Sequence, residues 1–525
     1  MATTLPVLHP FVGQDLTTLL DERAVTRDSS PLLVWRPDHG PVEQWTYAGF
    51  ADESRRVAAG LRRAGVQPGD RVLVLLDNCP EMLLTLAACA RLCACAVLAN
   101  TRSVTEDLAA YAALSRPSLA VVHQAHAHRL REAAPALQQI TVSADGFADA
   151  SFDTLRDCEP LDSDAPRPGP ADEAVIQFTS GTTGRPRAAV WTHANLLWAA
   201  KVTAGHLALR ANDRFLVHLP LFHTNALGWS AMPTLWCGGT IVLLPRFSRT
   251  GFWPASLEHR CTVTSMVPFC TAALRTVDVP RTHSYRIWGS AVCDPPSDAH
   301  FGVRSVGWWG MTETVGQGIV GDPDRADVPM SCGRPAAEYT LRVVDEHGTD
   351  VPVGATGELR IQGTPGLSLF AGYLDDPEST AAAYDPDGYL LTGDRLTVLE
   401  SGHLRFADRS KDMLKVGGEN VAASEVEQVL LRVAGVAEAA VVGRPDPMLD
   451  EVPVAFVVPA PAADLAALRE ALESAVSSGL APFKVPRELI FVDDLPRVTL
   501  DKVAKAHLRA RLSVRAAEPE PADLT

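Results

Sequence analysis

Features that direct a protein to nucleic acid or into a membrane are missing from these 525 residues. The sequence has 47 basic and 63 acidic residues, a formal net charge of −16, and no run of lysines and arginines. Binding to nucleic-acid phosphates relies on clustered cations, so we expect no nucleic-acid partner. The most apolar stretch, residues 82–99, is interrupted by Arg91, so we also expect no membrane span. The first eleven residues lack a basic segment followed by an apolar one, so no secretory signal is expected.

The ten cysteines show no regular spacing, and this argues against a disulfide framework. Reduced thiols are typical of the cytoplasm, where we expect the protein to be located. Cys89, Cys93 and Cys95 lie close together, as metal ligands often do. Their segment is apolar and has no nearby histidine, so we interpret them as small buried side chains.

The first half of the chain alternates helical and strand-like patterns. Residues 47–64 and 82–92 carry apolar side chains at helical spacing, whereas residues 71–76 and 94–99 are short apolar runs. This alternation is typical of a layered α/β domain with parallel strands. A chain of this length is also too long for a single hydrophobic core, so we expect at least two domains.

The pattern changes in the second half. Residues 331–406 contain short strands between Gly and Pro turns, which predicts a small β subdomain, and a shorter α+β segment follows. We predict a large N-terminal domain over residues 1–409, a smaller mobile α+β domain over 410–511, and a disordered acidic tail over 512–525. The strands expected here span 357–362, 389–392, 437–442 and 452–458, and the helices span 423–433 and 463–478.

Residues 179–190, TSGTTGRPRAAV, form a segment rich in hydroxyls and glycines. Small residues let several backbone N–H groups converge on an anion, so this composition favours a nucleotide phosphate. Residues 174–178 before it alternate like a strand, and we expect the segment from Thr192 to start a helix after the loop. The pattern G-x-x-x-x-G-K-[ST] of P-loop NTPases is absent. A surface turn remains the alternative for this segment taken alone.

Further motifs follow in a fixed order: WGMTET at 309–314, TGD at 392–394, DRSKD at 408–412, GGEN at 417–420, and LPR at 495–497. Together with the loop they resemble the acyl-adenylate-forming superfamily, which includes acyl-CoA synthetases, peptide-synthetase adenylation domains and luciferases. The resemblance covers about residues 45–511. It implies ATP, or the AMP moiety of an acyl-AMP, together with Mg²⁺ and coenzyme A. In the implied reaction a carboxylate attacks the α-phosphorus of ATP, and a thiol then attacks the acyl-AMP carbonyl.

The resemblance assigns several residues to the nucleotide. Glu313 matches the magnesium-binding glutamate and Thr312 a hydroxyl at the α-phosphate, although the pair would otherwise read as an ordinary helix start. Trp309 takes the aromatic position that stacks on adenine, where tyrosine is more usual. Asp394 matches the acid that holds both ribose hydroxyls, with a turn aspartate as the alternative. The other nucleotide-binding positions implied are Thr179, Ser180, Gly181, Thr182, Thr183, Gly184, Arg187, Gly289, Ser290, Ala291, Gly310, Met311 and Arg409.

The C-terminal motifs are assigned to domain movement and to the thiol. Lys411 fits the hinge between half-reactions, and a solvated linker lysine is the alternative. Gly417 and Gly418 resemble the glycines that let the pantetheine arm pass, and a hairpin turn is the alternative. Lys502 aligns with the catalytic lysine that bridges the substrate carboxylate and the α-phosphate, whereas we interpret Lys505 as structural.

The acyl group is assigned to residues 219–229, LPLFHTNALGW. His223 stands where the family keeps an aromatic residue or a histidine beside the carboxylate, so it is assigned to catalysis. No Asp or Glu occurs between Leu219 and Thr250, although an α-amino acid substrate would require a buried carboxylate for its ammonium. This favours a neutral acyl group, and a plain core segment is the alternative. Acyl contacts are predicted for Asn225, Gly228, Trp229 and Gly316.

The chain departs from the family pattern where ATP is handled. The loop ends Pro186-Arg187-Ala188 instead of Pro-Lys-Gly, and arginine does not replace lysine freely at a crowded phosphate site. Asp501 replaces a glycine and Val498 a threonine near Lys502. We therefore predict an acyl-CoA ligase with an intact thioester-forming step and weakened adenylation, which uses acyl-AMP from a separate adenylating enzyme. A complete two-step ligase, and acyl transfer to a carrier-protein phosphopantetheine, remain open as alternatives.

Overall fold

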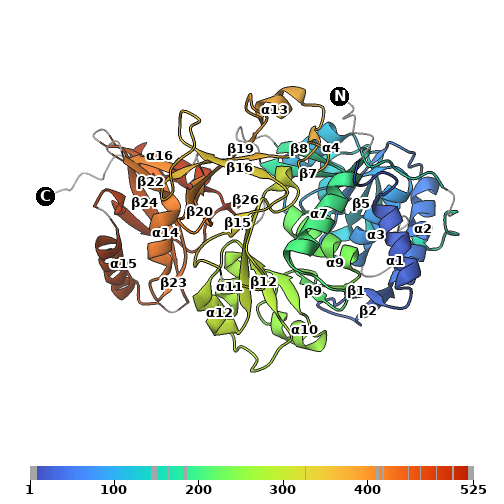
Figure 1. Cartoon of the computed structure of the whole chain (residues 1–525), viewed down its shortest axis with the longest axis horizontal. Helices are drawn as coiled ribbons and strands as arrows, with labels where there is room; N and C mark the ends of the chain where they lie inside the picture. The colour runs from blue at the N-terminus through green and yellow to red at the C-terminus, as the bar shows by residue number, and fades with distance from the viewer. Residues whose placement is uncertain are drawn as a thin grey trace. The chain divides into compact units, whose positions relative to one another are not determined.

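The computed structural model describes residues 9–142, 151–162, 165–180, 186–325, 327–409, 413–416, 419–446, 449–461, 463–480, 482–498 and 502–517. The chain divides into two compact units (Figure 1). The first comprises Met1–Leu341, Ile361–Leu391 and Ser401–Leu404, and the second Arg342–Arg360, Thr392–Glu400 and Arg405–Thr525. The second unit thus takes up two segments that precede residue 409. The mobility of residues 410–511 stays a prediction.

One sheet of the first unit has seven strands in the order β18-β8-β7-β4-β3-β5-β6. Strands β7, β4, β3, β5 and β6 are parallel, and β8 and β18 extend the sheet in antiparallel fashion. Strands β3 and β4 are almost fully buried, because both faces of a parallel sheet are covered, and this explains their continuous apolar sequences. Their bounds are β3 Arg71–Leu75, β4 Cys95–Leu98, β5 Leu119–His123, β6 Gln138–Val142, β7 Glu173–Ser180, β8 Pro186–Thr192 and β18 Gly372–Tyr373.

The second sheet of this unit has nine strands in the order β15-β14-β13-β12-β11-β9-β10-β1-β2. Its strands from β13 to β1 are parallel, whereas β2 at one end and β14 and β15 at the other are antiparallel. Ligands of such sheets bind beyond the carboxyl ends of the parallel strands, which here include β12 and β13. The bounds are β1 Pro31–Trp35, β2 Glu43–Thr46, β9 Arg214–Val217, β10 Thr240–Leu243, β11 Val263–Ser265, β12 Ile287–Ser290, β13 Arg304–Trp309, β14 Ile319–Val320 and β15 Arg334–Pro335.

The helices of the first unit confirm the α/β alternation read from the sequence. Helices α2 and α3 lie where helical spacing predicted them, and α7 and α9 pack against each other (Figure 1). Among the described residues, every helix is too short or too polar to cross a membrane. The helices are α1 Leu16–Thr26, α2 Tyr47–Arg63, α3 Pro80–Arg91, α4 Thr105–Ser115, α5 Gln124–Ala133, α6 Asp153–Arg156, α7 His193–His206, α8 Thr224–Ala226, the π-helix Leu227–Ala231, α9 Met232–Cys237, α10 Phe252–Glu258, α11 Pro268–Leu274, α12 Pro295–Phe301, the 3₁₀ helix Thr312–Thr314 and α13 Pro377–Ala382.

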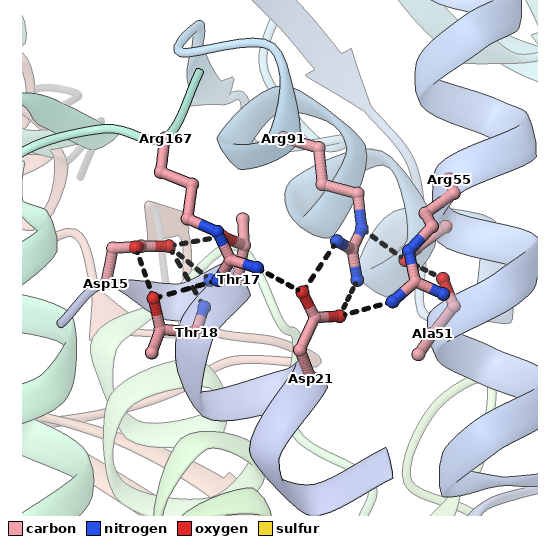
Figure 2. A network of polar contacts seen from close by, with 9 residues as sticks. Asp15, Thr17, Thr18, Asp21, Ala51, Arg55, Arg91 and Arg167 are labelled. Atoms are coloured by element: carbon pink, nitrogen blue, oxygen red, sulfur yellow. Dashed lines mark hydrogen bonds and ion pairs between the residues drawn. The ribbon is translucent and has the colours of Figure 1, made fainter. Parts of the chain in front are cut away.

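An ion cluster joins the first three helices (Figure 2). Asp15 caps α1, and Asp21 follows on the same helix. The carboxylate of Asp21 accepts hydrogen bonds from Arg55 of α2 at 2.8 Å, Arg91 of α3 at 2.8 Å and Arg167 at 3.0 Å. Arg91, which interrupts the apolar stretch in the sequence, therefore pairs with a carboxylate that is only 18% exposed. Three guanidinium groups surround one carboxylate, so the cluster depends on that carboxylate's charge.

The cysteines follow the sequence interpretation. All ten are free thiols. Cys89 and Cys95 are fully buried, whereas Cys93 is half-buried in the turn before β4. Burial raises the pKa of the Cys89 thiol to about 12, which keeps it protonated.

The second unit has its own core in a five-stranded sheet. Strands β23 and β24 form a long antiparallel pair, and β25 adds in parallel to β24. A four-stranded sheet, β16-β17-β19-β20, also gives most of its residues to this unit, and helix α16 continues past the predicted start of the tail at 512. The bounds are β16 Thr340–Val344, β17 Thr356–Gln362, β19 Leu390–Val398, β20 Leu404–Arg409, β21 Met413–Val416, β22 Glu419–Ala422, α14 Ala423–Leu431, β23 Val436–Asp446, β24 Asp450–Pro459, α15 Leu465–Gly479, the 3₁₀ helix Pro482–Lys484, β25 Glu488–Phe491, β26 Arg497–Val498, β27 Lys502–Val503 and α16 Lys505–Ala517.

Candidate active site

The segment predicted to hold phosphate joins two antiparallel strands. Strand β7 ends at Ser180 and β8 starts at Pro186, which pairs with Ser180. Residues 181–185 lie outside the described residues, and so do the predicted contacts of Gly181, Thr182, Thr183 and Gly184. The helix start expected from Thr192 is confirmed, because α7 begins at His193 with Thr192 as its N-cap, but residues 186–190, which we expected to belong to the loop, lie in strand β8.

Arg187, at the end of this loop, contacts an aromatic ring. Its guanidinium lies 5.2 Å from the centroid of the Tyr373 ring. The Tyr373 hydroxyl donates a hydrogen bond of 2.8 Å to Oε1 of Glu313, whose residue is only 5% exposed. Burial and then the Glu313 carboxylate raise the pKa of Tyr373, so the hydroxyl stays protonated and can donate. Tyr373 thus links the loop end to the predicted magnesium ligand, and sequence reasoning did not find it.

Thr312 occupies a tightly anchored turn after β13. Its carbonyl oxygen accepts a 2.9 Å hydrogen bond from Nε1 of Trp191, and its hydroxyl oxygen lies 3.2 Å from that of Thr224. Val315, three residues on, has a φ of +62°, in the left-handed region that β-branched residues rarely adopt. Backbone strain of this kind persists where the surroundings hold it, often at functional sites. The turn therefore presents Thr312 and Glu313 on a rigid support.

Two tryptophans and two glycines pack together beside this turn. Trp229 and Trp308 meet edge to face, with ring centroids 5.8 Å apart. A Cβ on Gly310 would lie 2.7 Å from Cζ2 of Trp229, and a Cβ on Gly289 would overlap the Trp308 ring. Trp229 comes from the π-helix, a rare element that often marks functional sites, and its Nε1 donates to the Val315 carbonyl at 2.8 Å. Glycine is required at positions 289 and 310 because the tryptophan rings come so close to the backbone there. The indole N–H of Trp229 already has a hydrogen-bond partner within the protein.

The predicted adenine positions lie on adjacent parallel strands. Gly289 and Ser290 end β12, Trp309 ends β13, and Ala291 directly follows β12. Trp309 is 6% exposed, and its carbonyl oxygen accepts from the Gly318 amide at 3.0 Å. The structure brings these positions to one sheet edge, together with the neighbouring residues Gly310 and Met311. Stacking of Trp309 on adenine stays a prediction.

The predicted acyl residues surround the start of α8. His223 is the half-buried residue before this helix, and its ring meets Phe222 edge to face at 4.5 Å. Asn225 accepts a hydrogen bond of 2.6 Å from the Ser265 hydroxyl of β11. Gly228 lies against Trp191, and Gly316 follows Val315, with its amide facing the Thr314 carbonyl. The segment is a buried helical turn, so the alternative of plain core packing also holds for part of it.

The remaining predicted positions belong to the second unit. Asp394 is 5% exposed within β19 and directly follows Gly393, whose φ is +69°. Arg409 ends β20 and Lys502 begins β27, but their side chains lie outside the described residues, as do Lys411, Gly417 and Gly418 entirely. Nζ of Lys505 lies 2.9 Å from Oε1 of Glu427, in agreement with its structural interpretation. The roles assigned to Asp394 and to the other five residues stay predictions.

A separate group of potential metal ligands lies at the ends of β3 and β5. Oδ2 of Asp77 is 3.1 Å from Nε2 of His126 and 3.6 Å from Nδ1 of His123. The other ring nitrogen of His126 faces Nη2 of Arg129 at 3.4 Å, and the Asp77 amide donates to Nδ1 of His123 at 3.0 Å. A ligating histidine requires an acceptor at its second nitrogen, whereas a guanidinium offers only donors. We therefore interpret Asp77, His123 and His126 as a group held together by hydrogen bonds, and not as a metal site.

Comparison with known proteins agrees with the motifs. The family model of the AMP-binding enzymes matches residues 20–374, and that of the AMP-binding enzyme C-terminal domain matches residues 425–502. Crotonobetaine/carnitine–CoA ligases of Proteus mirabilis and Salmonella paratyphi C are 32% and 33% identical, over 94% and 95% of this chain and 99% of theirs.

Solved structures give the same result. An anthranilate–CoA ligase in complex with anthranoyl-AMP is similar with a TM-score of 0.88 and 26% identity, over 99% of this chain and 100% of that one. A benzoate–CoA ligase from Burkholderia xenovorans matches with a TM-score of 0.84 and 28% identity, over 94% and 99%. The chain belongs to the AMP-binding enzyme family, within the acyl-CoA synthetase branch of the acyl-adenylate-forming superfamily.

Proposed function

We propose that this chain joins a carboxylic acid to coenzyme A in two half-reactions through an acyl-AMP. In the first, the carboxylate oxygen attacks the α-phosphorus of ATP and pyrophosphate leaves. In the second, the thiol of coenzyme A attacks the acyl carbonyl and AMP leaves. The observation that best supports this is the placement of Thr312 and Glu313 on one strained, well-anchored turn, where Tyr373 of β18 donates a hydrogen bond to Glu313.

The side chains of this turn fit the charge that the first step develops. We assign the Thr312 hydroxyl to the α-phosphate, and the Glu313 carboxylate has the oxygen ligands that Mg²⁺ prefers. The hydrogen bond from Tyr373 orients that carboxylate. A bound magnesium ion would neutralise phosphate charge. We assign Lys502 to the bridge between carboxylate and phosphate, and His223 to the side of the carboxylate.

The acyl group is proposed to be uncharged near the carboxylate. The segment from Leu219 to Thr250 offers no acid for an ammonium and no cation before Arg246. Trp229 commits its N–H to Val315, so it offers only apolar surface. The relatives named above act on anthranilate, benzoate and crotonobetaine or carnitine. A panel of benzoate, cyclohexanecarboxylate, octanoate and crotonobetaine therefore covers the aromatic, alicyclic, straight-chain and quaternary ammonium classes.

Weakened adenylation, with acyl-AMP from a separate enzyme, is the second candidate, because the loop ends in Arg187-Ala188. Two contacts favour the complete reaction instead. Ala188 is 1% exposed in the sheet core, where its methyl group packs away from solvent. Arg187 stacks on the tyrosine that orients Glu313, so it retains a place beside the phosphates.

One experiment separates the candidates. ATP–pyrophosphate exchange is measured with each acid of the panel, beside thioester formation from the matching acyl-AMP and coenzyme A. Both activities with one acid would support the two-step ligase. Thioester formation without exchange would support the split reaction, and Arg187→Lys with Ala188→Gly should then restore exchange. Exchange without thioester formation from acyl-AMP and coenzyme A, together with acyl transfer to a phosphopantetheinylated carrier protein, would indicate the carrier as acceptor.

A further inference from the structure

A glutamine that no sequence motif singled out lies behind Thr312. Gln177 is on β7, between β4 and β8, and is 2% exposed. Its Oε1 accepts a hydrogen bond of 3.1 Å from the Thr224 hydroxyl, whereas its Nε2 is buried without a hydrogen-bond partner among the described residues. Buried N–H groups without partners are rare in native proteins, rarer than carbonyl oxygens that lack a donor.

Gln177 and Thr312 are connected through one hydroxyl. The Thr224 oxygen is 3.1 Å from Oε1 of Gln177 and 3.2 Å from the Thr312 oxygen. Each threonine hydroxyl has a single proton to donate. If Thr224 donates to Gln177, it can only accept from Thr312, and the Thr312 proton then points inward. The amide orientation of Gln177 therefore decides the direction of both hydroxyls.

Turning the amide by 180° reverses this direction without moving any other heavy atom, since amide oxygen and nitrogen have nearly the same shape. Nε2 then donates to Thr224, Thr224 donates to Thr312, and the Thr312 proton is free to point out of the chain of bonds. The buried N–H group gains a partner in this arrangement, and the atom left without one is a carbonyl oxygen. The strand position of Gln177 and the anchored turn of Thr312 hold the heavy atoms in place.

We propose that Gln177 is a positioning residue. It directs the Thr312 hydroxyl through Thr224, so that Thr312 donates a hydrogen bond to a charged oxygen of the nucleotide α-phosphate. This rests on the proposed function, which places that phosphate at Thr312. A donor already oriented before the reaction stabilises charge that develops in the transition state. A hydroxyl turned inward presents only lone pairs to the phosphate and repels it.

The test replaces Gln177 by glutamate, which has the same shape. When its carboxylate is ionised, it can accept hydrogen bonds but cannot donate one. Gln177→Glu should lower kcat for ATP–pyrophosphate exchange about 10- to 100-fold at pH 8, with a smaller effect on the KM for ATP. The ratio of variant to wild-type kcat should rise toward acid pH, because a protonated carboxyl can donate to Thr224 again. His223 and Glu313, the titratable neighbours of the two threonines, are common to both proteins, so the ratio isolates the introduced carboxyl.

Gln317 supplies a matched control. It is fully buried, its Oε1 accepts from the Thr203 hydroxyl at 2.9 Å and lies 3.4 Å from Nδ1 of the titratable His206, and its Nε2 also lacks a partner among the described residues. Gln317→Glu therefore buries the same charge without a link to Thr312, and its kcat ratio should show no rise toward acid pH. Two variants of Thr224 give an independent test. Thr224→Val should lower kcat at pH 8 as Gln177→Glu does, whereas Thr224→Ser keeps the hydroxyl and should retain most of the activity.

Three results would overturn the proposal. These are an unchanged kcat in Gln177→Glu, a pH profile shared with Gln317→Glu, or a Thr224→Val variant as active as wild type. If wild type lacks exchange but converts acyl-AMP and coenzyme A, only the two-step function fails, and the same variants are compared in that reaction, where the α-phosphate is also present. If wild type is inactive in both reactions, the proposed function fails and this assignment fails with it.

Discussion

Replacing Asp21 by asparagine removes the charge at the centre of the ion cluster in Figure 2 while keeping the shape of the side chain. The side chain of Asp21 is 18% exposed and that of Arg91 only 8%, so this pair is largely buried. Removing one partner of a buried pair leaves the other charge uncompensated and costs about 3–5 kcal/mol. The amide oxygen can still accept from Arg91, and the contacts to Arg55 and Arg167 are more exposed. We therefore expect a loss near the lower end, about 3 kcal/mol.

Lowering the pH should reduce the difference in unfolding free energy between wild type and Asp21→Asn. Burial alone would raise the pKa of Asp21, but the hydrogen bond from Arg91 and the charges of Arg91, Arg55 and Arg167 lower it below its usual value. A carboxyl whose pKa is lower in the folded state stabilises the protein above its unfolded pKa and loses that effect as pH falls through the folded pKa. The difference in unfolding free energy between wild type and Asp21→Asn should therefore have its full value at pH 7 and decrease below about pH 4.

Urea unfolding followed by tryptophan fluorescence measures this effect in the correct unit, because all ten tryptophans lie between residues 35 and 309. Glu258→Gln is the control: its pair with Arg36 has a similar short distance, 3.0 Å against 2.8 Å for Asp21 and Arg91, but the side chains of Glu258 and Arg36 are 47% and 28% exposed. Exposed pairs contribute at most about 1 kcal/mol. A loss for Asp21→Asn no larger than for Glu258→Gln, or a gap that stays constant from pH 7 to pH 3, would refute the reasoning.

Three other predictions concern the site. Tyr373→Phe removes a hydrogen bond to a carboxylate, so the magnesium concentration for half-maximal exchange should rise about tenfold; an unchanged magnesium dependence would contradict the role of Tyr373. Asp394→Ala should weaken binding of a stable acyl-AMP analogue by about 1–3 kcal/mol in calorimetry, and unaltered affinity would remove Asp394 from the ribose site. Gly418→Leu should abolish thioester formation from acyl-AMP while calorimetry still shows nucleotide binding, and normal thioester formation would exclude the tunnel assignment.

Local patterns predicted much of the fold because their causes are local. Strands β3 and β4 appear as apolar runs because both of their faces are buried, and α7 begins next to Thr192 because that side chain caps it. Strand β8 was missed because a proline and an arginine open it, and its strand character comes from pairing with β7. Pairing partners cannot be read from a seven-residue segment.

The same difference between local and long-range causes applies to the residues of the site. Thr312, Glu313 and Trp309 could be found because they form one contiguous motif, and the structure places them at the end of β13 and in the turn that follows it. Tyr373 and Gln177 could not be found in this way, because their contacts to Glu313 and Thr224 span 60 and 47 residues. Tyr and Gln are common in strands for reasons of packing alone. Only the tertiary structure shows that they touch the motif.

The packing of glycines against tryptophans imposes an order on any change of these four residues. Gly289 and Gly310 cannot gain a side chain while Trp308 and Trp229 keep their present rings. A variant that first shortens Trp308 opens space, after which a larger residue at position 289 becomes acceptable. The reverse order passes through a protein that cannot pack. Related enzymes that differ at both positions are therefore expected to have changed the tryptophan first, and libraries meant to alter substrate choice should vary each glycine together with its ring.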